Sequence, residues 1–345
     1  MIWLSVDDRP PRGLGSRFFL ARDLRMALRA EELPASLFSI YRDLPELITD
    51  PAADVVFPID ETHPAFPGDP VGLRRALERD DVCYTGSIAD AAALAYDKGR
   101  ARQAMADAGV VVPLGISLAT PADIEPLIAS FRQRHDGPMV AKPTHGPGGS
   151  YGVTLLPTLD DAMRYLHAPE RTWRHPLLIE EFVNGREITV WVLGIGDDLD
   201  TSTTFVLDKQ GRAILDHDLK ERIGGKHQLA SECEDLSTTD LSTVQEAARQ
   251  AHRALGCYSY SRVDAILRDG QAVVLEVNAQ PTIPSSGRVM LNAGTGKTLG
   301  EVVQTFVEHA HLRHRERRVA TAPVMSVPAS TAPEVLAAGR DRPDR

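Results

Sequence analysis

The sequence predicts a mixed α/β protein in which an N-terminal parallel α/β lobe is followed by two α+β lobes. Three observations support this fold class. The first third alternates short apolar strands with amphipathic helices, which is typical of a parallel sheet covered by helices. The rest combines further helices with strand–turn–strand segments. A chain of 345 residues can bury more than one core, so two or three lobes are expected.

The lobe boundaries are placed where this pattern changes. They give an N-terminal lobe at 1–96, a central lobe at 97–176, a C-terminal lobe at 177–312 and a tail at 313–345. The tail starts with a short basic run and continues with Pro, Ala, Thr and Ser, so we expect it to be disordered. Short basic runs at helix ends are usually solvated, which speaks against a nucleic-acid role for this one.

The elements of the first third follow from apolar periodicity and helix caps. The clearest helix is 16–32, because its apolar residues recur on one face and Ser16 can cap its start. Gly109 and Pro113 end the last helix of the series. The predicted strands are 2–6, 36–41, 54–59 and 82–85, and the predicted helices are 16–32, 71–79, 89–96 and 98–108.

Beyond residue 112 the predicted strands are short and separated by two helices. In the central lobe the strands are 115–118, 139–142 and 152–155, and the helices are 122–134 and 159–167. An apolar strand from Leu177 opens the C-terminal lobe.

Composition excludes several function classes. The net charge of −10 argues against a nucleic-acid partner, whose binding depends on Lys and Arg. Cys83, Cys233 and Cys257 lie far apart in the sequence, so neither a disulfide framework nor a zinc site is expected. The first strand runs into two aspartates and does not resemble a signal peptide, and no apolar run approaches a membrane span. We therefore expect a cytoplasmic protein without a membrane partner.

Two short alternating stretches, Arg262-Val263-Asp264 and Glu276-Val277-Asn278, carry the strongest chemical signal. Residues two apart in a strand share a face, and the Asp269-Gly270 turn between the stretches folds them together. The result is three oxygen ligands and one guanidinium at one place, which suits a hard cation such as Mg²⁺. The alternative is a surface hairpin with ordinary exposed charges.

A glycine-rich loop, 142–152, begins at Lys142 after an apolar strand. Its glycines let backbone N–H groups approach an anion, and Lys142 adds a charge at the edge. Since a strand follows it instead of a helix, it is neither a P-loop nor a dinucleotide fingerprint. A plain turn is the alternative.

A further strand–turn–strand segment spans 180–190. Phe182 and Val183 would suit a flat purine ring, and Glu187 could accept from ribose hydroxyls, although a plain hairpin is the alternative. Gly294-Thr295-Gly296-Lys297-Thr298 is not a P-loop, because the required first glycine is replaced by Leu291.

Together these segments resemble the ATP-grasp superfamily and, within it, the D-alanine–D-alanine ligase-like family. The similarity covers about residues 85–312. The matching motifs are Tyr84-Thr85-Gly86-Ser87, Asp97-Lys98, Ala141-Lys142-Pro143 with the glycine-rich loop, Ile179-Glu180-Glu181, the stretch 185–190, the stretch 254–257, Arg262-Val263-Asp264 and Leu275-Glu276-Val277-Asn278. The resemblance implies an ATP-grasp fold, in which the two α+β lobes clasp ATP and the N-terminal lobe binds substrate.

The resemblance also implies which residues bind the nucleotide and the metal. The phosphate-binding residues would be Lys98, Lys142, Gly149, Ser150, Tyr151 and the mobile-loop lysine, Lys220. The adenine and ribose would be held by Glu180, Glu181, Phe182, Val183 and Glu187. Two Mg²⁺ ions, with Mn²⁺ as an alternative, would be bound by Asp264, Glu276 and Asn278.

The implied reaction is the ATP-dependent joining of a small carboxylic acid to a small amine. A carboxylate accepts an amine poorly, so transfer of the γ-phosphoryl group first makes an acyl phosphate. Arg262 would stabilise the oxyanion formed when the amine attacks, with Lys220 and Ser150 as the other catalytic residues. The resemblance also allows a homodimer.

The departures from the family pattern fall in the amino-acid pockets. The segment 7–17 lacks the family's glutamate, a different sequence stands at 60–70, and Glu221 replaces a tyrosine. We therefore expect other amino-acid-like substrates, in a specialised biosynthetic pathway. Candidate substrate residues are Arg9, Arg12, Arg17, Gly287 and Arg288. The guanidinium group of one of these arginines could bind a substrate carboxylate other than the one that is activated.

Three alternatives to this function stay open. They are a housekeeping D-alanine–D-alanine ligase, a non-catalytic ATP-binding regulatory module, and phosphoryl transfer to an acceptor other than a carboxylate. The missing pocket motifs speak against the first. Retention of Arg262 speaks against the second, because a module that only binds ATP could lose it.

Overall fold

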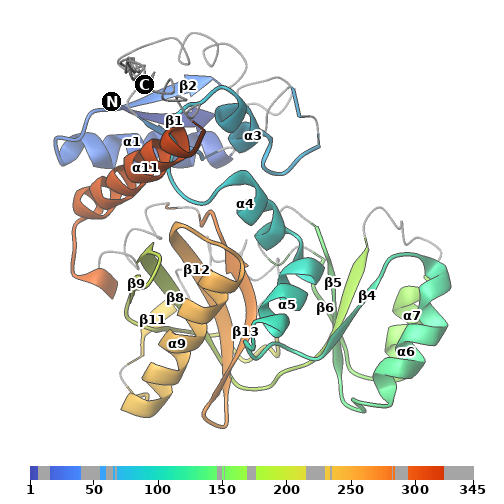
Figure 1. Ribbon diagram of the computed structural model, residues 1–345. Helices are drawn as coiled ribbons and strands as arrows, with labels where there is room; N and C mark the ends of the chain where they lie inside the picture. The colour runs from blue at the N-terminus through green and yellow to red at the C-terminus, as the bar shows by residue number, and fades with distance from the viewer. Residues whose placement is uncertain are drawn as a thin grey trace, which may run out of the picture.

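The computed structural model of the protein contains three sheets arranged in three lobes (Figure 1). It describes residues 1–6, 16–39, 55–59, 65–66, 68–145, 150, 152–168, 176–214, 230–233, 235–281, 283 and 294–321. The fold is mixed α/β, as the sequence predicted.

The N-terminal lobe is built on a parallel three-stranded sheet. The order is β2-β1-β3, with β1 at Ile2–Val6, β2 at Ala35–Ser39 and β3 at Val55–Phe57. Helix α1, Ser16–Ala30, packs on it through apolar residues that include Leu24 and Leu28. The parallel pairing confirms the predicted architecture of this lobe.

Helix α11, Leu299–Thr321, crosses back from the C-terminal end to lie along this lobe (Figure 1). Its buried residues recur at helical spacing and join the core of the N-terminal sheet; they are Leu299, Val302, Val303, Phe306 and Ala310. The predicted disorder from residue 313 is therefore wrong as far as Thr321, because the helix continues to that residue. Arg313 contributes to this by donating a hydrogen bond to the carbonyl of Tyr84 in the N-terminal lobe. The remainder, 322–345, lies outside the described residues.

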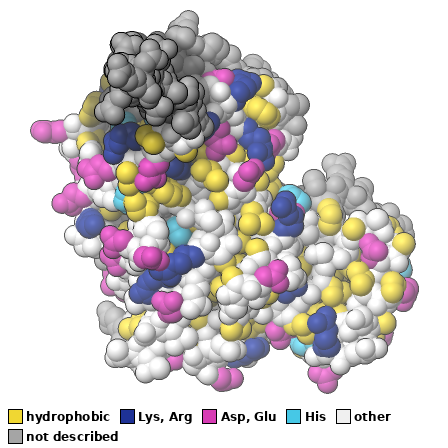
Figure 2. Space-filling view, in the orientation of Figure 1, with side chains coloured by type: hydrophobic (Ala, Val, Ile, Leu, Met, Phe, Trp, Pro, Cys, Tyr) yellow, Lys and Arg dark blue, Asp and Glu magenta, His cyan; other side chains and the backbone are white. Residues whose placement is uncertain are grey.

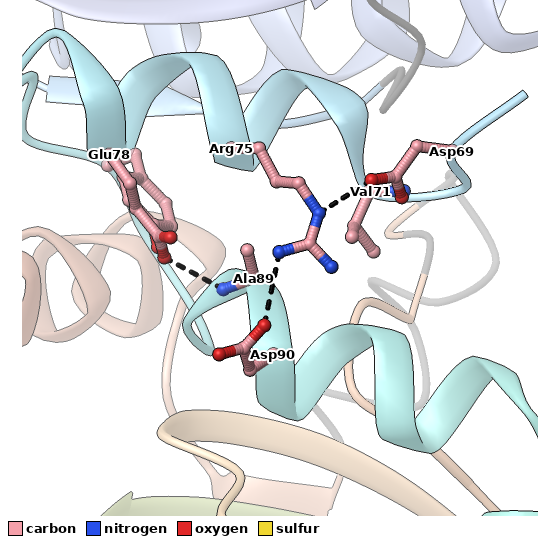
Figure 3. Close-up of polar contacts among 7 residues, drawn as sticks. Asp69, Val71, Arg75, Glu78, Ala89 and Asp90 are labelled. Carbon is pink, nitrogen blue, oxygen red and sulfur yellow. Dashed lines mark hydrogen bonds and ion pairs between the residues drawn. The ribbon is translucent and has the colours of Figure 1, made fainter. Parts of the chain in front are cut away.

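Helix α3, Gly72–Arg79, is tied to the start of helix α4, Ala89–Tyr96, by side chains (Figure 3). The Arg75 guanidinium donates to Asp69 at 2.6 Å and to Asp90 at 3.1 Å. The Glu78 carboxylate accepts from the backbone N–H of Ala89 at 2.8 Å, which satisfies a donor at the N-terminus of α4.

The predicted strand at 82–85 is reduced to a single bridge between Val56 and Tyr84. Carbonyl groups that would form a strand ladder are bound by arginines instead. Arg74 donates to the carbonyl of Thr85 and Arg313 to that of Tyr84. Side chains here replace a neighbouring strand as hydrogen-bond partners of the backbone.

The central lobe is an antiparallel sheet covered by two helices, and α5, Lys98–Asp107, leads into it. Its strand order is β4-β7-β5-β6, with β4 at Gly115–Leu118, β5 at Met139–Pro143, β6 at Thr154–Leu156 and β7 at Leu177–Glu181. The 3₁₀ turn η1, Pro121–Asp123, precedes helix α6, Ile124–Arg132, and α7 spans Leu159–Leu166. Because β7 pairs with both β4 and β5, this sheet extends past the boundary predicted at residue 177.

The C-terminal lobe is a six-stranded antiparallel sheet with helix α9, Thr238–Ala254, on one face. The order is β11-β10-β8-β12-β13, and β9 pairs with β8. The strands are β8 at Arg186–Ile195, β9 at Asp198–Thr201, β10 at Phe205–Leu207, β11 at Ala230–Glu232, β12 at Ser259–Arg268 and β13 at Gln271–Asn278.

The surface carries both signs of charge. Figure 2 shows acidic and basic side chains interspersed over one face of the molecule. Among the described residues, no helix combines the length and apolar character needed to cross a membrane.

Candidate active site

The hairpin predicted from the sequence is present and brings its polar pairs together. Strands β12 and β13 are antiparallel, with Arg262 opposite Asn278 and Asp264 opposite Glu276. Directly opposed residues of an antiparallel pair point to the same face, so all four side chains share one side of the sheet. The turn residues Asp269 and Gly270 have φ values of 51° and 75°, as a type I′ turn requires.

Asp264 is nearly inaccessible to solvent and accepts hydrogen bonds from the side chains of Thr189 and Arg262. The Thr189 hydroxyl donates to its Oδ1 at 2.6 Å, and the Arg262 Nε donates to the same oxygen at 3.3 Å. Although burial alone would disfavour the charge, the carboxylates of Asp264 and Glu276 raise the pKa of Arg262 above its ordinary value. The Arg262 guanidinium therefore remains positively charged beside the acidic residues of the site.

The donor set on this face fits a hard divalent cation. Asp264 and Glu276 supply carboxylates and Asn278 supplies an amide oxygen. The Asn278 amide nitrogen is buried and, within the described part of the chain, has no hydrogen-bond partner. No group of three or more His, Cys, Asp or Glu residues arranged for a metal occurs among the described residues. A divalent cation bound on this face would therefore need the Asn278 amide oxygen as a third ligand beside the two carboxylates.

Lys142 and Glu180 form a buried ion pair in the central sheet. The Lys142 Nζ lies 2.5 Å from one Glu180 carboxylate oxygen, across the β5–β7 pairing. The other oxygen, Oε1, is buried and has no hydrogen-bond partner among the described residues. A buried acceptor left in this state is unfavourable unless a ligand donates to it.

Beside this pair the chain passes from the central to the C-terminal lobe. The Glu181 N–H donates to the carbonyl of Leu114 at 2.9 Å and the Phe182 N–H to that of Pro138 at 2.9 Å, so these two donors are already used. Val183 is buried in a small apolar cluster with Ile266 and Val273. This cluster provides an apolar wall at the junction of the two lobes.

Lys98 starts helix α5 next to the first residues of the glycine-rich loop. Its backbone N–H donates to the carbonyl of Thr144 at 3.0 Å, and Asp97 caps the helix. The Asp97 carboxylate also lies 3.4 Å from His145. At the other end of the loop Ser150 has a φ of 64°, a left-handed conformation that L residues adopt rarely.

Glu187 lies on the same face of the sheet as the metal-ligand candidates. It is opposite Ile266 on β12, two positions along from the Thr189–Asp264 pair. Sequence reasoning missed Thr189 itself. It could have been found from the strand alternation, because Thr189 lies two residues after Glu187 and therefore on the same face of the strand.

Several predicted residues cannot be placed. Those outside the described residues are Arg9, Arg12, Gly149, Tyr151, Lys220, Glu221, Gly287 and Arg288. Arg17 lies in α1, but its side chain is not described.

Comparison with known proteins gives the same family from two directions. A family model for the C-terminal part of D-alanine–D-alanine ligases, "D-ala D-ala ligase C-terminus", matches residues 117–308. The D-alanine–D-alanine ligase of Beijerinckia indica is 31% identical over 293 residues, covering 82% of this chain and 90% of that protein. The corresponding ligase of Methylocella silvestris is 32% identical over 297 residues, with coverage of 82% and 90%. The chain belongs to the D-alanine–D-alanine ligase family.

Solved structures of this family share the fold. A D-alanine–D-alanine ligase from Bacillus anthracis complexed with ATP superposes with a TM-score of 0.70 at 19% identity, covering 91% of this chain and 98% of that one. The VanG D-Ala:D-Ser ligase from Enterococcus faecalis gives 0.66 at 20% identity, with coverage of 90% and 98%. The fold is ATP-grasp, and the protein is an ADP-forming carboxylate–amine ligase.

Proposed function

We propose that this ligase joins two amino-acid substrates into a dipeptide, with D-alanine on both sides as the first candidate. The observation that carries the proposal is the shared face of β12 and β13, where Arg262 lies beside Asp264, Glu276 and Asn278. Support for D-alanine comes from relatives that match most of the chain and are named as D-alanine–D-alanine ligases. The altered pocket segments, which argued against D-alanine, lie largely outside the described residues.

ATP would lie between the central and C-terminal lobes. Its adenine would pack on the cluster of Val183, Ile266 and Val273 and donate to the buried Oε1 of Glu180. The Glu181 N–H already donates to the Leu114 carbonyl, so any backbone hydrogen bond from Glu181 to the adenine would use the Glu181 carbonyl as acceptor. Glu187 would accept from the ribose.

The phosphates would extend from there toward the glycine-rich loop. Lys142 and Lys98 would provide positive charge, and Ser150 with its neighbours Gly149 and Tyr151 would cover the terminal phosphate, joined by Lys220. Asp264, Glu276 and Asn278 would hold divalent cations, for which Mg²⁺ is the first choice and Mn²⁺ the second. Bound there, a divalent cation neutralises phosphate charge.

The chemistry is a phosphoryl transfer followed by acyl transfer. The carboxylate oxygen of the first amino acid attacks the γ-phosphorus, and ADP leaves. The amine of the second then attacks the acyl carbon, losing a proton to solvent or a nearby base, and the C–O bond to phosphate breaks. Arg262, whose positive charge is maintained by its acidic neighbours, would stabilise the oxyanion in between.

A second candidate is a ligase with a different acid or amine in a specialised pathway. The sequence supports it through the altered segments 7–17 and 60–70 and through Arg288, which stands where the resemblance places the second substrate's carboxylate. The same fold occurs in VanG, which is named a D-Ala:D-Ser ligase, so a changed second substrate is compatible with this fold.

The deciding experiment is ADP release measured over a panel of acids and amines, with the product mass determined. D-Alanine alone should support turnover and yield the dipeptide mass. Turnover only with a pair that includes an additional carboxylate would favour the second candidate. No ADP release with any acid and amine would refute both.

A further inference from the structure

The backbone carbonyls of the segment Tyr84-Thr85-Gly86-Ser87 accept hydrogen bonds from two arginines, which lie on two different helices. Arg74, on α3, donates to its second carbonyl at 3.2 Å and to its fourth. Arg313, on α11, donates to the first at 2.7 Å and to the third. Four consecutive carbonyl groups are thus bound alternately by two guanidinium groups.

Arg74 also reaches out of the N-terminal lobe to Gln280. Its Nη2 donates to the Gln280 side-chain oxygen, which in addition accepts from the Tyr260 hydroxyl at 3.0 Å. The Gln280 amide nitrogen donates to the carbonyl of Pro58, just beyond β3, at 2.6 Å. One side chain therefore connects α3, the end of β3 and the site hairpin.

The two residues of the hairpin in this network adjoin the active site. Gln280 is two residues past Asn278, and Tyr260 is two residues before Arg262. Residues two apart in a strand share a face, so Tyr260 continues the row formed by Arg262 and Asp264. The network lies at the end of the hairpin where the N-terminal lobe meets the metal-ligand candidates.

Close packing leaves this junction little freedom. Gly86 has a φ of +81°, and a Cβ there would lie 3.0 Å from the Tyr260 hydroxyl and 3.1 Å from the Gln280 oxygen. A side chain at this position would push apart the atoms that Arg74 brings together.

Burial of these charges is unfavourable for stability. Arg74 is completely buried, and burial together with the charge of Arg74 lowers the pKa of Arg313. Apolar side chains of similar volume would often fill such a site with equal or greater stability. The arrangement is better explained by what the guanidinium of Arg74 holds in place.

We propose that Arg74 is a positioning residue for the ligase reaction, acting through Gln280 to fix the end of β13 against the N-terminal lobe. The inference rests on the proposed function, since it concerns the alignment of the acid and amine with Arg262. Small displacements of reacting groups lower the rate of the chemical step strongly. Misalignment here should therefore lower kcat much more than it changes ATP binding, because most of the proposed ATP contacts lie away from the end of β13.

The kinetic test compares Arg74→Met, Gln280→Met and the double variant with Arg75→Met. Arg75 is the next residue on the same helix, and its partners Asp69 and Asp90 are not part of the Gln280 network (Figure 3). We expect kcat to fall ten- to a hundredfold in Arg74→Met and in Gln280→Met, with the KM for ATP within twofold. The double variant should be no worse than the worse single variant, and Arg75→Met should stay within twofold of wild type.

Gln280→Glu serves as the conservative variant. It keeps an acceptor for Arg74 and Tyr260 but loses the donor to the Pro58 carbonyl, so it should retain part of the kcat that Gln280→Met loses. It also keeps the test decisive if Arg74→Met does not fold. Losses that multiply in the double variant, a KM for ATP that rises in step with the loss of kcat, or equal kinetics in Arg74→Met and Arg75→Met would overturn the proposal.

Amide hydrogen exchange gives a readout that does not depend on turnover. A peptide covering 275–281 should exchange faster in Arg74→Met and Gln280→Met than in wild type, and remain unchanged in Arg75→Met. If wild type released no ADP with any substrate, the proposed function would fail while this measurement still decided the positioning role. Unchanged exchange in all variants would refute that role.

Discussion

The two faces of the sheet formed by β8, β12 and β13 use the same strands for opposite purposes. On one face Val190, Val263 and Val277 pack against α9 in a continuous apolar core. On the other, Thr189, Asp264 and Glu276 form the polar row of the candidate site. Each residue of one set is the chain neighbour of a residue of the other.

This difference teaches how the site obtains its rigidity. Buried apolar residues specify the strand register, because a slip by one residue would move the whole valine set to the polar side. The polar side chains are then held in fixed positions, because each is adjacent in the chain to one of the buried valines. Between Asp264 and Ala265 the register shifts at a β-bulge, which changes the pairing directly after the metal-ligand candidates.

The largest expected effect comes from the acidic pair on the polar face. Asp264→Asn and Glu276→Gln keep the side-chain volume but remove the charge that would hold a divalent cation. We expect each to lower turnover at least ~10³-fold, because such an ion contributes several kcal/mol to charge stabilisation. ADP release at saturating Mg²⁺ measures the loss, and the melting temperature serves as the control for folding. Normal turnover in either variant would remove that residue from the metal site.

Arg262→Met is expected to have the next largest effect. A fixed donor at a developing oxyanion is typically worth about 3–4 kcal/mol, so kcat should fall about 10²–10³-fold. Nucleotide affinity, measured by titration with a non-hydrolysable ATP analogue, should change little. The oxyanion role would be wrong if the variant lost nucleotide binding yet turned over normally at high ATP.

The packed face should respond to pH through stability instead of activity. His252 on α9 is buried and hydrogen-bonded to Ser261 at 2.8 Å, and burial, aided by the charge of Arg253, lowers its pKa to about 4. The unfolded chain, with an ordinary pKa of about 6.5, binds more protons between these values. Stability should therefore fall as the pH drops from about 6.5 to about 4, by up to ~3 kcal/mol.

Chemical denaturation across this pH range tests the assignment. His252→Gln should show a shallower fall of the unfolding free energy than wild type, because the titrating group is gone. Carboxylates contribute to both profiles, so the difference between the two proteins is the quantity to compare. Identical slopes would mean that His252 does not titrate in this window.

The hairpin could be predicted from the sequence because its information is local. Strand alternation and an Asp-Gly turn lie within a few residues of Asp264, and they determine which side chains meet. The same holds for the parallel N-terminal sheet, whose strands alternate regularly with helices.

Other features depend on contacts between distant segments. The continuation of α11 past residue 313 depends on burial against the N-terminal lobe, and the membership of β7 in the central sheet depends on its partners. The contact between Arg74 and Gln280 joins residues 206 positions apart. The strands β9, β10 and β11 are only three or four residues long, too short for a clear period.

The smallest expected effect tests the support beneath the metal ligands. Thr189→Val replaces the hydroxyl that donates to Asp264 with a methyl group of similar size. Residues that orient metal ligands commonly contribute about 10- to 100-fold in metal affinity or activity, and here we expect about tenfold at subsaturating Mg²⁺. Higher Mg²⁺ should recover part of the loss.

Thr189→Ser is the matched control, because it keeps the hydroxyl but loses a methyl group from the buried strand. If the hydrogen bond orients Asp264, the serine variant should retain near-normal activity while losing some stability, whereas the valine variant should lose activity. Activity retained in the serine variant and lost in the valine variant would separate the chemistry of the polar face from the packing that supports it. Equal activity losses in both variants would instead show that Thr189 acts through packing alone.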